Sequence, residues 1–249
     1  MSDGHARDQT EGQQTQRQFV KFTFYKVDPA WRRLPAEERE QGRLELCQVV
    51  DAFGDRMLIG TYSLVGLRGD ADFLLWQVAD RLEEFQALAT QVFSTAMGPY
   101  LTAPHSFLSM TRRSIYRTQL DSRSGEGRVR VTPGDAKYLF VYPFVKTRAW
   151  YELSKQARQE MMDEHIAVGR KYPSVKLNTT YSYGLDDQEF VVAFETDQPA
   201  DFLDLVMELR ETKASRYTLR DTPIFTCVAV PLPEILQSLG APGDAALAG

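Results

Sequence analysis

The segment TYSLVGL at residues 61–67 returns almost unchanged as TYSYGL at residues 180–185. Each copy lies in a stretch that is typical of a β-strand, and a second such stretch follows after a glycine-containing turn. A second echo lies nearby: Phe73 precedes Phe85 by 12 positions, and Phe190 precedes Phe202 by the same 12. Together the two echoes predict that one structural unit occurs twice in this chain.

Hydrophobic periodicity around these segments gives the same order of six elements in both halves, β-α-β-β-α-β, which is the ferredoxin-like order. We therefore expect an α+β fold in which two tandem ferredoxin-like (βαββαβ) repeats form a dimeric α+β barrel within one chain. The helices would lie outside, with a ligand pocket between the sheet and helices of one repeat. The alternative is two unrelated α+β halves. The expected strands span 19–27, 56–66, 70–78, 105–116, 137–146, 175–184, 189–197 and 222–232, and the expected helices span 35–53, 80–97, 154–171 and 199–217.

Periodicity and composition together divide the chain into five parts. A polar tail covers 1–18, the first repeat 19–116, a Gly- and Ser-containing linker loop 117–136, the second repeat 137–235, and a flexible tail 236–249. His5 lies in the first tail, and we expect it to be inert.

Composition restricts the class of partner. The net charge of −5 argues against nucleic acid as the main partner, because phosphate binding needs a concentrated basic surface. The start of the chain has no apolar core of a signal peptide, and no apolar run reaches the length of a membrane span. We expect a cytoplasmic protein in which Cys47 and Cys227 are buried free thiols.

One histidine lies where an apolar side chain would be expected. In the helix that Ser154 is suited to cap, Ala157, Met161, His165 and Val168 share a face. A core histidine with one hydrogen bond is the simplest interpretation. No second ligand on this face completes a zinc or di-iron set, but haem needs only one axial protein ligand, because the porphyrin supplies four nitrogens.

Several motifs in the second half resemble the chlorite dismutase-like family, and most closely its haem-biosynthetic branch, the coproheme decarboxylases. They are YPFVK (142–146), WYELS (150–154), EH (164–165), GRKY (169–172), GLDDQEF (184–190) and VMELRETKASRY (206–217). In the first half, YSLVGLRGDADFLLW and HSFLSMTRRSIY resemble the corresponding part of the family. The resemblance covers residues 19–235. It implies that the second repeat holds the haem and that the subunits form a homo-oligomer, a ring of five.

The resemblance also implies roles for individual residues. His165 matches the proximal iron ligand, and Glu208 is a candidate acceptor for its other ring nitrogen, although a surface salt bridge is the simpler interpretation. Tyr142 matches a tyrosine that becomes a radical, and Lys146 matches a proton donor or propionate anchor. Their even spacing on one strand places both on the same face. Without the resemblance, a packed tyrosine and a solvated lysine would be the preferred interpretations.

Further porphyrin contacts follow from the same matches. Arg128 or Arg130 lies at the propionate-binding arginine position, Ser215 matches a propionate-contacting serine, and Trp150 matches the pocket tryptophan. Where chlorite dismutases carry an arginine on the distal side of the haem, this chain has Leu177 or Asn178, depending on the direction of counting.

Three functions therefore remain open. The first is peroxide-dependent decarboxylation of iron coproporphyrin III, in which two propionates become the vinyl groups of haem b. The second is a haem b-dependent peroxidase or chlorite-converting enzyme. The third is a haem-binding or structural ring without enzymatic activity. The expected cofactor is haem b or iron coproporphyrin III, and the expected partners are a porphyrin substrate and hydrogen peroxide.

Overall fold

The structure, a computed structural model, describes residues 17–112, 114, 116, 130–134 and 136–240. The expected inert residue His5 and the candidate Arg128 lie outside these residues. Within the described part of the chain, no helix is both long and apolar enough to cross a membrane.

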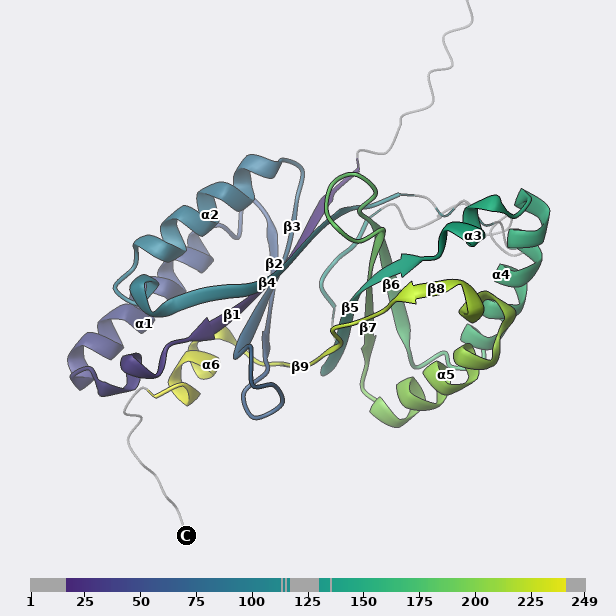
Figure 1. The fold of residues 1–249 in the computed structure, drawn as a ribbon. Coiled ribbons are helices and arrows are strands. Elements are labelled where there is room, and N and C mark those ends of the chain that lie inside the picture. Colours follow the sequence, from purple (N-terminus) through teal and green to yellow (C-terminus); the bar gives the residue numbers. More distant parts are fainter. Residues whose placement is uncertain (1–16, 113, 115, 117–129, 135, 241–249) are drawn as a thin grey trace, which may run out of the picture.

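Two units with the expected order of elements follow one another along the chain (Figure 1). The first contains β1 (Phe19–Val27), α1 (Ala36–Ala52), β2 (Leu58–Ser63), β3 (Phe73–Ala79), α2 (Leu82–Ser94) and β4 (Leu101–Met110), with 3₁₀ turns η1 (Pro29–Arg33) and η2 (Gly98–Tyr100). The second contains β5 (Tyr138–Lys146), α3 (Arg148–Glu152), α4 (Lys155–Gly169), β6 (Lys176–Tyr181), β7 (Phe190–Thr196), α5 (Pro199–Glu211), the 3₁₀ turn η3 (Lys213–Tyr217), β8 (Thr218–Arg220) and β9 (Phe225–Ala229). A last helix, α6 (Leu232–Ser238), follows.

The strands confirm the predicted barrel. Each repeat forms an antiparallel sheet, in the order β4-β1-β3-β2 in the first and β6-β7-β5-β9 in the second. The two sheets join through β4–β6 and β2–β9, which closes the ring and leaves β8 as an added edge strand on β5. The helices cover the outside of both sheets (Figure 1). Side chains from both repeats fill the interior of the barrel. For example, the rings of Phe24 and Phe225 stack with 3.9 Å between their centres.

The repeated segments occupy equivalent places. TYSLVGL contains the end of β2 and TYSYGL the end of β6, and each leads into a turn whose glycine has positive φ. The φ values are 76° at Gly66 and 72° at Gly184, a region that a residue without Cβ enters at little cost. Phe85 and Phe202 are the matching buried residues of α2 and α5. The sequence echo therefore marks the same turn and the same packing position twice.

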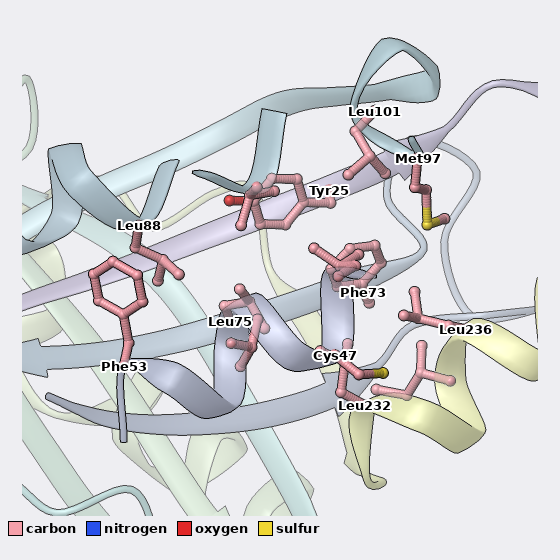
Figure 2. Packing of buried hydrophobic residues seen from close by; sticks show 14 of the residues in the cluster. Tyr25, Cys47, Phe53, Phe73, Leu75, Leu88, Met97, Leu101, Leu232 and Leu236 are labelled. Atoms are coloured by element: carbon pink, nitrogen blue, oxygen red, sulfur yellow. The ribbon is translucent and has the colours of Figure 1, made fainter. Parts of the chain in front are cut away.

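The outer helices of the two repeats differ in how many of their residues are buried. On the first repeat, α1 buries Gly42, Leu46, Cys47 and Val50, and α6 returns to the same layer. Figure 2 shows Leu232 and Leu236 of α6 beside Cys47 and Phe73 in this cluster. The equivalent helix of the second repeat, α4, has no buried residue at all. Helix α4 is therefore less deeply buried than α1, its counterpart in the first repeat.

Several predicted boundaries need correction. The strand expected at 105–116 is β4, which already begins at Leu101 and ends at Met110. The helix expected at 199–217 ends at Glu211, where Thr212 takes an extended backbone, and η3 follows. The tail expected from residue 236 begins inside α6, which continues to Ser238 because Leu236 and the following Leu239 are buried against the first repeat. Cys47 and Cys227 are buried and free, as expected.

Candidate functional site

Helix α4 places His165 over the sheet of the second repeat. The helix begins where Ser154 Oγ accepts a hydrogen bond from the backbone N–H of Ala157 at 3.1 Å, which confirms the predicted N-cap. The inward face that the sequence predicted is present, but Ala157, Met161, His165 and Val168 are only half-buried. His165 is therefore not a tightly packed core residue.

The environment of His165 keeps its imidazole neutral. Burial lowers the pKa of His165 to about 4; the positive charge of Lys146 lowers it further, and Glu164 opposes the change. The ring nitrogen Nδ1 is buried, and none of the described residues is its hydrogen-bond partner, which is costly unless the site is completed by another group. Among the described residues, no group of three or more His, Cys, Asp or Glu could hold a metal ion. A centre that needs one protein ligand fits these facts, and haem iron is such a centre.

Lys146 lies at the end of β5, near His165. Its Nζ donates a hydrogen bond to the backbone oxygen of Ala214 at 2.9 Å and lies 4.7 Å from the centre of the Trp150 ring. Trp150 is 2% exposed, and its ring packs against Tyr217. Burial lowers the pKa of Lys146 to about 8, although the charge of Glu189 opposes this change. The predicted residues Lys146, Trp150 and His165 are thus brought together from β5, α3 and α4.

Tyr142 lies on the same helix-facing side of β5, as its even spacing from Lys146 predicted. Its ring stacks on Phe194 with 6.0 Å between the ring centres, in a cluster that Phe202 of α5 covers. Burial raises the pKa of Tyr142; the negative charge of Asp221 raises it further, and Arg210 opposes the increase. Tyr142 is therefore a buried, protonated phenol. The ion pair of Arg210 with Asp221, which the sequence did not reveal, is close enough to act on it.

The strand register distinguishes the two candidates for the distal position. Leu177 lies opposite Phe194 of β7, so it shares the helix-facing side, and it is 44% exposed. Asn178 points to the other side, into the barrel, where it is buried and donates a hydrogen bond to Glu195 Oε2 at 2.7 Å. Of the two candidates, Leu177 is therefore the one on the helix-facing side of the sheet, and it carries no charge.

The structure describes the surroundings of three other candidates. Glu208 accepts hydrogen bonds from Lys171 and, at 2.6 Å, from the hydroxyl of Tyr172, so it is not the acceptor for His165. Ser215 Oγ lies 2.6 Å from the carbonyl oxygen of Arg210 and therefore closes the end of α5 rather than standing free. Arg130 is exposed.

A chain of hydrogen bonds beside Lys146 was missed by the sequence analysis. Tyr151 of α3 donates to Glu189 Oε2 at 2.6 Å and also bonds the hydroxyl of Tyr183 at 2.7 Å. Glu189 Oε2 in turn accepts from the backbone N–H of Lys146 at 2.8 Å. The only sequence signal was that Tyr151, Tyr183 and Glu189 lie in or beside the motifs WYELS and GLDDQEF, since Tyr151 is 32 and 38 positions away from the other two.

Comparisons with known proteins identify the family of this chain. A family profile described as chlorite dismutase matches residues 39–230. A protein of Mycolicibacterium smegmatis named coproheme decarboxylase is 33% identical over 181 residues, covering 72% of this chain and 76% of that protein. A coproheme decarboxylase of Staphylococcus carnosus is 30% identical over 78% of this chain and 84% of that protein.

Solved structures give the same result. Chlorite dismutase from Candidatus Nitrospira defluvii, in complex with imidazole, superposes with a TM-score of 0.81 at 28% identity, covering 90% of this chain and 95% of that one. A haem-binding protein from Thermus thermophilus superposes with a TM-score of 0.78 at 25% identity, covering 89% and 94%. The chain belongs to the chlorite dismutase family.

Proposed function

We propose that this protein is a coproheme decarboxylase, which uses hydrogen peroxide to convert iron coproporphyrin III into haem b. The observation that carries the proposal is that Tyr142 and Lys146 of β5 both lie on the helix-facing side of the second repeat, where Lys146 is close enough to His165 of α4 to act on its charge. The similarity to two proteins named coproheme decarboxylase supports it.

The residues under α4 fit an iron porphyrin. The inward face of α4 is left half-exposed, Nδ1 of His165 lacks a partner, and the sheet below presents the apolar side chains of Leu177 and Phe194. A flat apolar macrocycle would cover these surfaces, and neutral His165 would hold the iron on one side. When bound, the iron porphyrin supplies the oxidising power that peroxide brings to the site.

The chain's own residues would then act on the propionates. Lys146 has a pKa of about 8, so at neutral pH it carries a charge that binds a carboxylate, yet it can release a proton at modest cost. Tyr142, a buried phenol, would give up its hydroxyl hydrogen and then take a hydrogen from the β-carbon of a propionate. The resulting propionate radical would pass a second electron to the peroxide-derived oxidant and lose carbon dioxide as the vinyl group forms, so that one hydrogen peroxide accepts the two electrons of each decarboxylation.

The charge pattern at the distal side favours decarboxylation over chlorite conversion. Leu177 offers no cation to hold an oxyanion, so chlorite would lack the partner that an arginine supplies in the chlorite dismutases. By family resemblance we also propose that the protein is cytoplasmic and assembles as a ring of five; light scattering tests the assembly, and a monomer at all concentrations would contradict it.

A comparison of substrates tests the function. The protein is loaded with iron coproporphyrin III without oxygen, titrated with hydrogen peroxide, and its porphyrin is analysed by mass spectrometry. We expect the stepwise loss of two carboxyl groups. Rapid decomposition of chlorite by haem b-loaded protein, without decarboxylation of coproheme, would select the chlorite-converting alternative. Protein that binds neither porphyrin would indicate the structural ring.

A further inference from the structure

Tyr183, Tyr151 and Glu189 form a hydrogen-bonded chain whose direction is fixed by chemistry. Tyr151 donates its hydroxyl hydrogen to Glu189 Oε2 at 2.6 Å. A tyrosine has only one hydroxyl hydrogen, so in the 2.7 Å bond between the two hydroxyls Tyr183 must be the donor and Tyr151 the acceptor. A proton leaving Tyr183 can therefore pass to Tyr151 while the proton of Tyr151 passes to the carboxylate.

The chain connects the pocket wall with the surface. At its inner end, Glu189 Oε2 also accepts the backbone N–H of Lys146 at 2.8 Å, and Tyr151 directly follows the buried Trp150. At its outer end, Tyr183 is 47% exposed, and its ring packs edge-on against Phe190 at 5.1 Å. Tyr183 is thus hydrogen-bonded to Tyr151 at one end and exposed to solvent. It is therefore placed to exchange electrons with molecules in solution.

A proton acceptor matters because a phenol gives up an electron easily only if its proton leaves as well. Burial raises the pKa of Tyr183 to about 12, so the group is protonated at neutral pH and needs such an acceptor. A second Tyr–Glu bond provides a contrast: Tyr172 donates to Glu208 at 2.6 Å, but among the described residues no second tyrosine extends that bond. In the chain at Tyr183, the carboxylate of Glu189 is therefore linked to two tyrosines, one after the other, whereas Glu208 is linked to Tyr172 alone among the tyrosines.

We propose that Tyr183 is a surface site at which small phenols in solution are oxidised by one electron, with Tyr151 and Glu189 as its proton relay. This inference rests on the proposed function, because the oxidant is peroxide acting at the bound iron porphyrin. Tyr183 gives one electron to that oxidant, and its proton moves to Tyr151 as the proton of Tyr151 moves to Glu189. A phenol then gives one electron to Tyr183 and its own proton to water, and the relay returns the proton from Glu189 to Tyr183.

The first test locates the oxidised residue. Coproheme-loaded protein is mixed with hydrogen peroxide and a nitroso spin trap, and the adducts are mapped by peptide mass spectrometry. We expect an adduct on Tyr183 in the wild type and none at that position in Tyr183→Phe. The adduct should fall at least about tenfold in Tyr151→Phe and Glu189→Gln, since both lose the proton transfer. Tyr172→Phe, which breaks the comparison pair, should match the wild type.

Two rates separate this site from the decarboxylation. Tyr183→Phe should form haem b at the wild-type rate but oxidise guaiacol at least about tenfold more slowly, because only the outer site is lost. Wild-type protein that forms haem b without an adduct on Tyr183, or a Tyr183→Phe variant that oxidises guaiacol normally, overturns the inference and leaves the proposed function standing. Wild-type protein that forms no haem b contradicts the proposed function instead.

A measurement without porphyrin tests the relay by itself. Porphyrin-free protein is oxidised by a photogenerated ruthenium trisbipyridyl oxidant in water and in deuterium oxide. We expect oxidation of Tyr183 to be slower in deuterium oxide, and to be at least about tenfold slower in Tyr151→Phe than in the wild type, because the proton acceptor is lost. Oxidation of Tyr183 at the same rate in the wild type and in Tyr151→Phe shows that Tyr151 carries no proton, and it refutes the relay whatever the bound enzyme does.

Discussion

Replacing Lys146 by methionine should stabilise the porphyrin-free protein at neutral pH. Burial lowers the pKa of Lys146 from 10.5 to about 8, and each pKa unit corresponds to about 1.4 kcal/mol, so the folded state disfavours the charged form by about 3 kcal/mol. Methionine is unbranched and apolar and can fill the same volume. It loses the hydrogen bond to Ala214, which contributes about 1 kcal/mol. The expected net gain at pH 7 is about 2 kcal/mol.

The stability difference between Lys146→Met and the wild type should depend on pH in a defined direction. Between pH 8 and 10.5 the unfolded chain binds more protons at Lys146 than the folded chain does, so wild-type stability rises with pH in that window. Below pH 8 both states are protonated, and the full penalty applies. The advantage of Lys146→Met should therefore be constant below pH 8, shrink above it, and be lost by about pH 10.

Urea unfolding of both proteins, followed by circular dichroism at several pH values, measures this difference. Lys155→Met, which removes an exposed lysine at the start of α4, is the matched control and should change the unfolding free energy by less than about 0.5 kcal/mol. A Lys146→Met variant that is less stable than wild type at pH 7, or whose advantage does not depend on pH, would refute the reasoning. Lys146→Met should also lose the proposed decarboxylation of coproheme. The reason is that the charge of Lys146, which destabilises the folded protein, is the charge that would bind a propionate.

Three further predictions concern other parts of the barrel. His165→Ala should fold but lose the optical and electron-spin signature of histidine-ligated ferric porphyrin; an unchanged spectrum would contradict its assignment as ligand. Gly134→Ala should lower the unfolding free energy by about 1–3 kcal/mol, because its Cβ would collide with Oε1 of buried Glu195, whereas Gly69→Ala, with nothing within 4 Å, is the control for urea unfolding. Leu177→Arg should bind azide more tightly in spectral titrations of the ferric haem-loaded protein, because it adds a cation on the pocket side; unchanged affinity would place Leu177 away from the haem.

The repeat could be predicted from sequence because its signals are local. A glycine at positive φ has few substitutes, so the turn at Gly66 returns in the second repeat as the turn at Gly184. Phe85 and Phe202 recur because the first turn of each helix must bury one large side chain against the sheet. The barrel then follows, since two such sheets each have an inner face that needs cover.

The features that the sequence did not predict correctly depend on contacts between segments that are distant in the chain. Helix α6 belongs to the first repeat's core although it ends the second repeat, and nothing near Leu236 in the sequence shows this. Glu208 was the expected acceptor for His165, but its carboxylate accepts hydrogen bonds from Lys171 and Tyr172 instead. The link between Tyr151 and Tyr183 joins residues 32 positions apart, so periodicity cannot reveal it.

The most direct test of the proposed decarboxylation compares wild type with Tyr142→Phe. The substitution keeps the ring and its contact with Phe194 and removes only the hydroxyl, so stability should change by about 0.5–1.5 kcal/mol or less. Both proteins are loaded with iron coproporphyrin III and treated with hydrogen peroxide, and the extracted porphyrin is analysed by mass spectrometry. We expect haem b from the wild type, and from the variant a bound porphyrin that keeps all its carboxyl groups. Haem b formation by Tyr142→Phe at the wild-type rate would contradict the central claim, because it would make Tyr142 a packing residue.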